Sequence, residues 1–266
     1  MNADASTDRL RACWREDRLA LCMGIRQART PDIAQIVAAC GFDALYVDME
    51  HSPVSLETTS ALCIAASGAG ITPLVRVPAL DGGFIGRVLD GGARGVIVPH
   101  VERVEHAEAI VRQAKFPPLG KRSVMGAGPP TAYRTMALAE TNRVAGDIVV
   151  VAMLETPAGI DAAMDIAAVP GLDMLLIGTN DLCTELGVPG QIREPRILDA
   201  YRRVGGACKA HDRVLGIGGI RGDLELQREL FALGARFVIA GNDVSYLAAA
   251  AREDASRLQA VGRPAQ

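Results

Sequence analysis

The chain has 266 residues, of which 49% are hydrophobic and 22% charged, and its formal net charge is −3. This composition excludes a disordered or collagen-like chain. The mild negative charge argues against non-specific binding to nucleic acid or to an anionic membrane. The six cysteines include no Cys-x-x-Cys pair, so we predict free thiols rather than a disulfide framework or a structural zinc site.

Eight short apolar runs recur along the chain and predict β-strands, because each is flanked by Gly, Pro or Asp. The runs are Leu19–Ile25, Ala44–Asp48, Thr72–Val77, Gly95–Pro99, Ile148–Leu154, Met174–Ile177, Val214–Ile217 and Phe237–Ala240. Helical patterns lie between most of them, at Pro31–Ala39, Leu56–Ser67, Gly83–Leu89, Val104–Lys115, Gly159–Ala168, Ile197–Ala210 and Asp223–Leu233. The segment 116–146 is too long for an ordinary connection, and such segments usually carry a function or are mobile.

Strand and helix alternate throughout, which indicates a parallel sheet covered by helices. Eight such units in about 250 residues favour a (β/α)8 TIM barrel. An open doubly wound sheet would show a Gly-x-Gly-x-x-Gly after an early strand, and none is present. We therefore predict one α/β domain over residues 1–266. Residues 1–18 would form an N-terminal extension or helix, and residues 244–260 a C-terminal helix that closes the barrel or docks on another subunit.

Ionisable and polar residues follow almost every predicted strand, at the end of the barrel where chemistry gathers. They are Asp48, Glu50 and His51, then Arg76, then His100 and Glu102, then Glu155, then Gly178 to Asp181, and finally Asn242 and Asp243. So many ionisable groups are costly to desolvate unless they are paired or bind a ligand. Salt bridges around the barrel mouth are the plainer alternative.

The residue types at these strand ends indicate metal-assisted chemistry. Glu155 and Asp181 follow adjacent strands, and two carboxylates with open positions suit a hard divalent cation that also binds substrate. Arg76 offers forked donors for a carboxylate or a developing enolate oxygen. His51 can carry a proton, and Asp90 could orient it. None of the three lysines ends a strand, which disfavours an imine mechanism.

At these residues the sequence resembles the HpcH/HpaI aldolases, class II pyruvate aldolases of the phosphoenolpyruvate/pyruvate barrel type. The similarity spans about Ala20 to Leu258. It rests on five segments in order: GFDALYVDMEHSP with His51, PLVRVP with Arg76, GARGVIVPHVE followed by KFPPLGKRS, AMLETPAGI with Glu155, and LIGTNDL with Asp181.

The resemblance implies a (β/α)8 barrel whose eighth helix is exchanged between subunits, in a homohexamer built as a trimer of dimers. It implies that Glu155 and Asp181 bind Mg²⁺, or else Mn²⁺, Co²⁺ or Zn²⁺. It further implies that pyruvate chelates this ion with Arg76 at its keto oxygen. Gly178, Thr179 and Asn180 would line the substrate site, and Asp48 would reach the site of a neighbouring subunit.

Two positions depart from the family pattern. Met153 stands where Gln is common, and Thr179-Asn180 stands where Pro and a small residue are common. Both changes touch the expected pocket floor and bear on substrate preference.

The predicted reaction is reversible cleavage of a 4-hydroxy-2-oxo acid into pyruvate, or a close 2-oxo acid, and an aldehyde. The resemblance is to 4-hydroxy-2-oxoheptanedioate and 2-dehydro-3-deoxyglucarate aldolases, which implies aromatic-compound or sugar-acid catabolism. A citramalyl-CoA or malyl-CoA lyase, an oxaloacetate decarboxylase and a catalytically silent scaffold barrel are the alternatives. The first residues lack the pattern of a secretory signal and no apolar run could span a membrane. We therefore expect a cytoplasmic enzyme whose partners are a small 2-oxo acid, an aldehyde and further copies of its own chain, with no nucleic acid or membrane partner.

Overall fold

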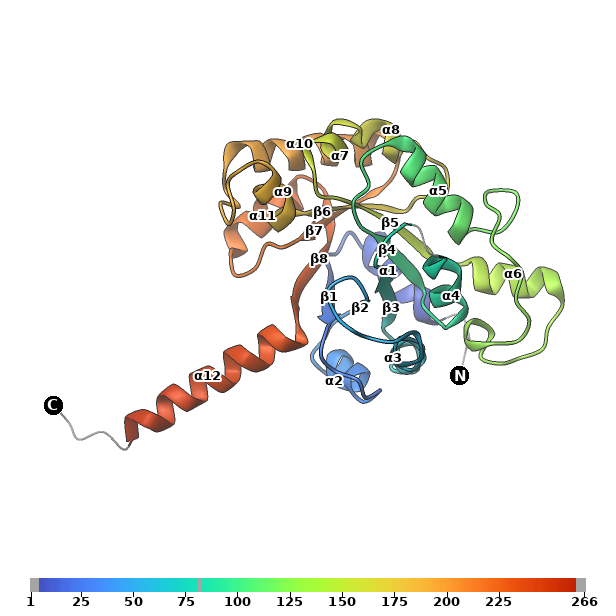
Figure 1. The fold of residues 1–266 in the computed structure, drawn as a ribbon, viewed down its shortest axis with the longest axis horizontal. Coiled ribbons are helices and arrows are strands. Elements are labelled where there is room, and N and C mark those ends of the chain that lie inside the picture. The colour runs from blue at the N-terminus through green and yellow to red at the C-terminus, as the bar shows by residue number, and fades with distance from the viewer. Residues whose placement is uncertain (1–4, 81–82, 262–266) are drawn as a thin grey trace.

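The protein forms a closed barrel of eight parallel strands that pair in chain order (Figure 1). The structure is a computed structural model and describes residues 5–80 and 83–261, so positions 1–4 and 262–266 of the predicted domain lie outside the described residues. The strands are β1 (Ala20–Ile25), β2 (Ala44–Asp48), β3 (Thr72–Arg76), β4 (Gly95–Val98), β5 (Val149–Leu154), β6 (Met174–Gly178), β7 (Val214–Gly218) and β8 (Ala235–Asn242). The predicted (β/α)8 barrel is confirmed.

Helices follow or cover these strands. They are α1 (Ala5–Arg15), α2 (Ile33–Ala39), α3 (Leu56–Gly68), α4 (Phe84–Asp90), α5 (Val104–Ala114), α6 (Leu138–Gly146), α7 (Pro157–Asp161), α8 (Ala163–Ala167), α9 (Thr179–Glu185), α10 (Pro195–Ala210), α11 (Leu224–Ala232) and α12 (Asp243–Val261), with a short 3₁₀ helix η1 (Pro129–Thr131). Two of the predicted segments differ from the helices observed. The single helix expected over Gly159–Ala168 is broken at Ala162 into α7 and α8, and the segment 116–146 contains η1 and α6.

Two apolar layers hold the barrel together. The outer layer packs between strands and helices and includes Val47, Val75 and Leu175, all fully buried. The inner layer fills the barrel with alternate strand residues such as Leu74, Ile97 and Leu176. Because successive side chains of a strand point to opposite faces, each strand contributes to both layers. This explains why the strand runs are apolar throughout.

Helix α1 covers the amino-terminal end of the barrel. Its Leu10 and Cys13 are fully buried in the inner layer. Arg9 at the helix and Arg18 just after it bind the buried carboxylate of Asp43, at distances of 2.9 to 3.0 Å. With that end covered, the opposite end is left for ligands.

Helix α12 projects away from the barrel in Figure 1 and has no buried residue. Its Leu247, Leu258 and Val261 are 73%, 72% and 83% exposed. Most of the helix therefore does not pack on its own barrel. No helix in the described part of the chain is both long enough and apolar enough to cross a membrane.

Candidate active site

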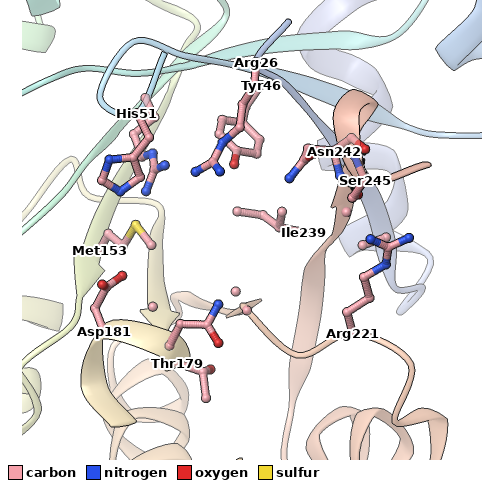
Figure 2. A pocket seen from close by; sticks show the side chains of 17 residues that line it. Arg26, Tyr46, His51, Met153, Thr179, Asp181, Arg221, Ile239, Asn242 and Ser245 are labelled. Carbon is pink, nitrogen blue, oxygen red and sulfur yellow. Dashed lines mark hydrogen bonds between the residues drawn. The ribbon is translucent and has the colours of Figure 1, made fainter. Parts of the chain in front are cut away.

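A cavity of about 340 Å³ opens at the carboxyl end of the barrel (Figure 2). Arg76, Gly178, Gly218 and Asn242, the last residues of four strands, all line it. The wall is completed by Arg26, Tyr46, His51, Met153, Thr179, Asn180, Asp181, Gly219, Arg221, Ile239, Ala240, Gly241 and Ser245. The cavity lies where a (β/α)8 barrel carries its chemistry.

Arg76 is held by a buried carboxylate from the neighbouring strand. Its Nε and Nη2 donate to the two oxygens of Asp48 at 3.0 and 2.7 Å, because β2 and β3 place the two residues in register. Arg26 donates to the same carboxylate at 2.7 Å. Burial opposes ionisation of Asp48, but the hydrogen bonds from Arg76 and Arg26 hold its pKa below the ordinary value. The guanidinium of Arg76 is thus fixed in orientation and permanently charged.

A chain of polar contacts runs from Arg76 to Glu155. Glu50 Oε2 lies 2.8 Å from Arg76 Nη1, and Glu50 Oε1 lies 3.0 Å from His100 Nε2. His100 Nδ1 is 3.3 Å from Glu155 Oε2, and the His100 amide donates to the same oxygen at 3.0 Å. His100 has a φ of 56°, the left-handed region that non-glycine residues seldom occupy. Such backbone strain gathers at functional sites.

Glu155 is a buried carboxylate, with 2% of its surface exposed. Burial raises its pKa to about 7, and the neighbouring charges of Asp181 and Glu50 act in the same direction. The side chain fits only because residue 178 is glycine. A Cβ at Gly178 would lie 2.5 Å from Glu155 Cγ and 2.6 Å from Glu155 Oε1.

The residues present fit a divalent cation. Burial is the main cause of the raised pKa of Glu155, and the negative charge of Asp181 raises it further, so a cation bound by both carboxylates would favour the ionised form of Glu155. In the described part of the chain, no group of three or more His, Cys, Asp or Glu side chains could hold a metal alone. Mg²⁺ is commonly bound by one or two carboxylates and completes its shell with water and substrate oxygens. Glu155 and Asp181 are the residues that would hold it.

His51 and Asp90 are not brought together within one chain. His51 lines the cavity with its side chain half exposed, 3.7 Å from Glu50. Asp90 ends α4 and accepts a hydrogen bond from Arg122 at 2.7 Å, in a separate hollow with Lys121 and Ser123. Proximity in sequence to the third strand suggested the pair, but α4 carries Asp90 away from the carboxyl end of the barrel. In its own chain, Glu50 is the carboxylate beside His51.

The expected contact of Asp48 with a neighbouring subunit stays a prediction, because the structure describes a single chain. Asp48 is fully buried, and Arg76, Arg26 and the amides of Glu50 and His51 take up its two oxygens. Asp48 therefore acts inside its own barrel by fixing Arg76.

Sequence reasoning missed part of the wall. Arg26, Tyr46, Arg221 and Ser245 line the cavity but were not assigned to a site. Arg26 and Arg221 come directly or shortly after the first and seventh strand runs, and that position was the available signal. Glu50 and His100 were noted as strand-end residues but were given no role. The structure places Glu50 beside Arg76 and His100 beside Glu155. None of the segment 116–146 lines the cavity.

Comparison with known proteins agrees with this fold. A family model described as HpcH/HpaI aldolase/citrate lyase matches residues 26–250. The 4-hydroxy-4-methyl-2-oxoglutarate aldolase cghB of Chaetomium globosum is 38% identical over 92% of this chain and 93% of its own. The corresponding aldolase tasA of Hapsidospora irregularis is 40% identical over 92% of both chains.

Among solved structures, an HpcH/HpaI aldolase from Desulfitobacterium hafniense superposes with a TM-score of 0.88 at 28% identity, covering 96% of this chain and 97% of its own. The matches extend over nearly the whole barrel and include every strand end that lines the cavity. The chain belongs to the HpcH/HpaI aldolase/citrate lyase family.

Proposed function

We propose that the protein is a divalent-metal-dependent class II aldolase that reversibly cleaves a 4-hydroxy-2-oxo acid into pyruvate, or a close 2-oxo acid, and a second carbonyl compound. It is a carbon–carbon lyase, since relatives that match almost its full length are aldolases. The observation that carries the proposal is the fixed guanidinium of Arg76 and the carboxylate of Asp181 in the cavity wall. The buried Glu155 lies behind Gly178 of that wall, close enough for the charge of Asp181 to raise its pKa further.

Each end of the pyruvate half has a group to bind it. A divalent cation held by Glu155 and Asp181, of which Mg²⁺ is the leading candidate, would polarise the 2-oxo group and acidify the adjacent carbon. Arg76 uses its Nε–H and one Nη2–H on Asp48, and its Nη1 lies 2.8 Å from Glu50 Oε2. The Nη–H groups that these two carboxylates leave over can donate to the 2-oxo oxygen as negative charge develops there. The wall at Gly178, Thr179 and Asn180 receives the carboxylate of this half.

In cleavage the bond between C3 and C4 breaks. The 4-hydroxyl loses its proton and C4 becomes a carbonyl carbon, while the electron pair of the broken bond remains with the pyruvate half, which is then protonated at C3. His51 is the group we assign to the hydroxyl proton, because its ring lines the cavity and remains open to solvent for proton exchange.

The similarity to cghB and tasA narrows the proposed substrate to 4-hydroxy-4-methyl-2-oxoglutarate, whose cleavage yields two molecules of pyruvate. This compound carries a carboxylate on each half. A cavity of about 340 Å³ is of the size that binds small ligands of this kind.

Exchange of the pyruvate methyl protons with D2O tests the metal-assisted step without a second substrate. We expect exchange with Mg²⁺ or Mn²⁺, loss on chelation, and recovery when the ion is restored. Absence of exchange with every divalent ion, at protein concentrations that bind pyruvate, would rule the proposal out.

We further propose that the enzyme is a cytoplasmic homo-oligomer, a hexamer of three dimers, in which α12 packs on a second copy. The support is the exposure of Leu247, Leu258 and Val261 on a helix that touches its own barrel near Tyr246 and has no buried residue. Burial of such side chains against a second copy would remove apolar surface from water.

A further inference from the structure

The charges around the cavity balance except for one arginine. Asp48 and Glu50 neutralise Arg26 and Arg76 through the contacts given above. The charges of Glu155 and Asp181 match that of a bound divalent cation. Arg221 also lines the cavity, yet within the described chain no carboxylate lies within ion-pair distance of its guanidinium. A cation without a counter-charge in a ligand cavity is available for an anionic group of the ligand.

An aromatic ring holds the side chain of Arg221 in place. Its guanidinium carbon lies 4.9 Å from the ring centre of Tyr246, the distance of a cation–π contact. Tyr246 is in turn in edge contact with Phe42, at a ring separation of 6.2 Å. This stacking leaves the guanidinium N–H groups free to donate in the plane of the guanidinium.

Asn242 adds a donor on the same side of the cavity. Its Oδ1 accepts the Ser245 amide at 2.9 Å, which assigns the orientation of the side-chain amide. The Nδ2 group therefore remains as a donor, and Figure 2 shows the Asn242 side chain pointing into the cavity.

Arg221, Asn242 and Ser245 lie across the cavity from His51, Met153 and Asp181 in Figure 2. Arg221 follows β7, Asn242 ends β8 and Ser245 comes shortly after it. Asp181 follows β6 and Glu155 follows β5. The pyruvate half belongs to the side of Glu155 and Asp181, so a ligand long enough to cross the cavity presents its other end to Arg221.

We propose that Arg221, assisted by Asn242, binds the carboxylate next to C4 of the substrate and so selects substrates whose released half is itself a 2-oxo acid. This inference rests on the proposed aldolase function and assigns a specificity-determining residue to it. A planar guanidinium matches the two oxygens of a carboxylate, and its charge stays constant at all working pH values. A neutral aldehyde gains nothing from this group.

The test compares two acceptors of equal length in the addition direction, with pyruvate as donor. Glyoxylate carries a carboxylate next to its aldehyde, whereas glycolaldehyde carries a hydroxymethyl group. The measured quantity is the ratio of kcat/KM for glyoxylate to kcat/KM for glycolaldehyde. We expect Arg221→Met to lower this ratio about 10- to 100-fold, since hydrogen bonds to charged groups contribute that much. Arg221→Lys should recover part of the loss.

Arg202→Met is the matched control, because Arg202 is an exposed arginine on α10 outside the cavity. Its ratio should equal that of the wild type. An unchanged ratio in Arg221→Met, or an equal loss with both acceptors, would overturn the assignment of Arg221 alone. Failure of the wild type to exchange pyruvate methyl protons with any divalent ion would instead overturn the aldolase function and this inference with it. Thermal unfolding of each variant reports whether the barrel is intact.

Discussion

Gly178 lies directly against Glu155: a Cβ at position 178 would stand 2.5 Å from Glu155 Cγ. The last residue of β6 therefore determines where the carboxylate that follows β5 can go. Register between the two strands places them side by side, and the absence of a side chain at 178 leaves the room.

Gly178→Ala should displace Glu155 and weaken metal binding. A contact of 2.5 Å cannot be tolerated, so the carboxylate must move, and we expect Mn²⁺ affinity and kcat to fall at least about tenfold each. Titration with Mn²⁺ and the cleavage assay measure the two effects. Gly206→Ala is the control, since a Cβ at Gly206 on α10 meets no atom within 4 Å. Normal metal affinity in Gly178→Ala would contradict this account of the site.

Glu155→Gln should separate metal binding from folding. The substitution keeps an oxygen for the His100 amide but removes the charge that the cation needs, so we expect Mn²⁺ affinity to fall by more than about 100-fold. Burial raises the pKa of Glu155 to about 7, which means that the folded metal-free protein disfavours the ionised form. The metal-free variant should therefore unfold at the same temperature as the wild type or higher at pH 8. A lower melting temperature would show that Glu155 is chiefly a structural residue.

Asp48→Asn should destabilise the barrel and impair catalysis together. It leaves Arg76 and Arg26 without the carboxylate that both of them bind, and breaking a buried ion pair typically costs about 3–5 kcal/mol. Chemical denaturation measures this loss. Asp161→Asn is the matched control: Asp161 pairs with Arg203 at 2.8 Å with both side chains largely exposed, so its loss should cost less than about 1 kcal/mol. Equal effects of the two changes would refute the role of Asp48.

Asp43, at the amino-terminal end of the barrel, should make the free energy of unfolding depend on pH. Burial acts against its ionisation, but the hydrogen bonds from Arg18, the Leu21 amide and Arg9 hold its pKa below the ordinary value. A folded-state pKa below the unfolded one means that its stabilisation is complete above the unfolded pKa of about 4 and is lost as the pH falls through the folded value.

Urea unfolding from pH 7 to pH 3 tests this. The difference in unfolding free energy between the wild type and Asp43→Asn should be constant above about pH 5 and shrink below it. A difference that stays constant down to pH 3 would show that folding does not lower the pKa of Asp43.

The exposed apolar residues of α12 should control assembly. We expect Leu247→Ser with Leu258→Ser to shift the protein from an oligomer to smaller species in size-exclusion chromatography with light scattering. These side chains are 73% and 72% exposed in the single chain, so their loss should not disturb its core. Arg252→Ser, at an exposed polar position of the same helix, is the control. An unchanged molar mass would mean that α12 does not join the subunits.

The fold and much of the cavity wall follow from local features of the sequence. All eight strands lie within two residues of their predicted bounds, because a strand buried on both faces must be apolar along its length. The polar residues that end those strands could be placed at one end of the barrel since parallel strands share a direction. Arg76, Glu155, Asp181 and His51 were identified in this way.

The tertiary structure decided which of these groups meet. Strand register brings the carboxylate of Asp48 to Arg76 and the side chain of Glu50 to His100. The direction of α4 carries Asp90 to Arg122 instead of to His51. The spacing of residues in the sequence encodes neither register nor helix direction. The absence of a carboxylate partner for Arg221 among the described residues likewise becomes visible only in the folded chain, where Arg221 lies across the cavity from Asp181 (Figure 2). Sequence determined the class of barrel and the kinds of group at its mouth, because hydrophobic period and residue type are local properties. Pairing, burial and orientation needed the closed barrel, because they arise between segments far apart in the chain.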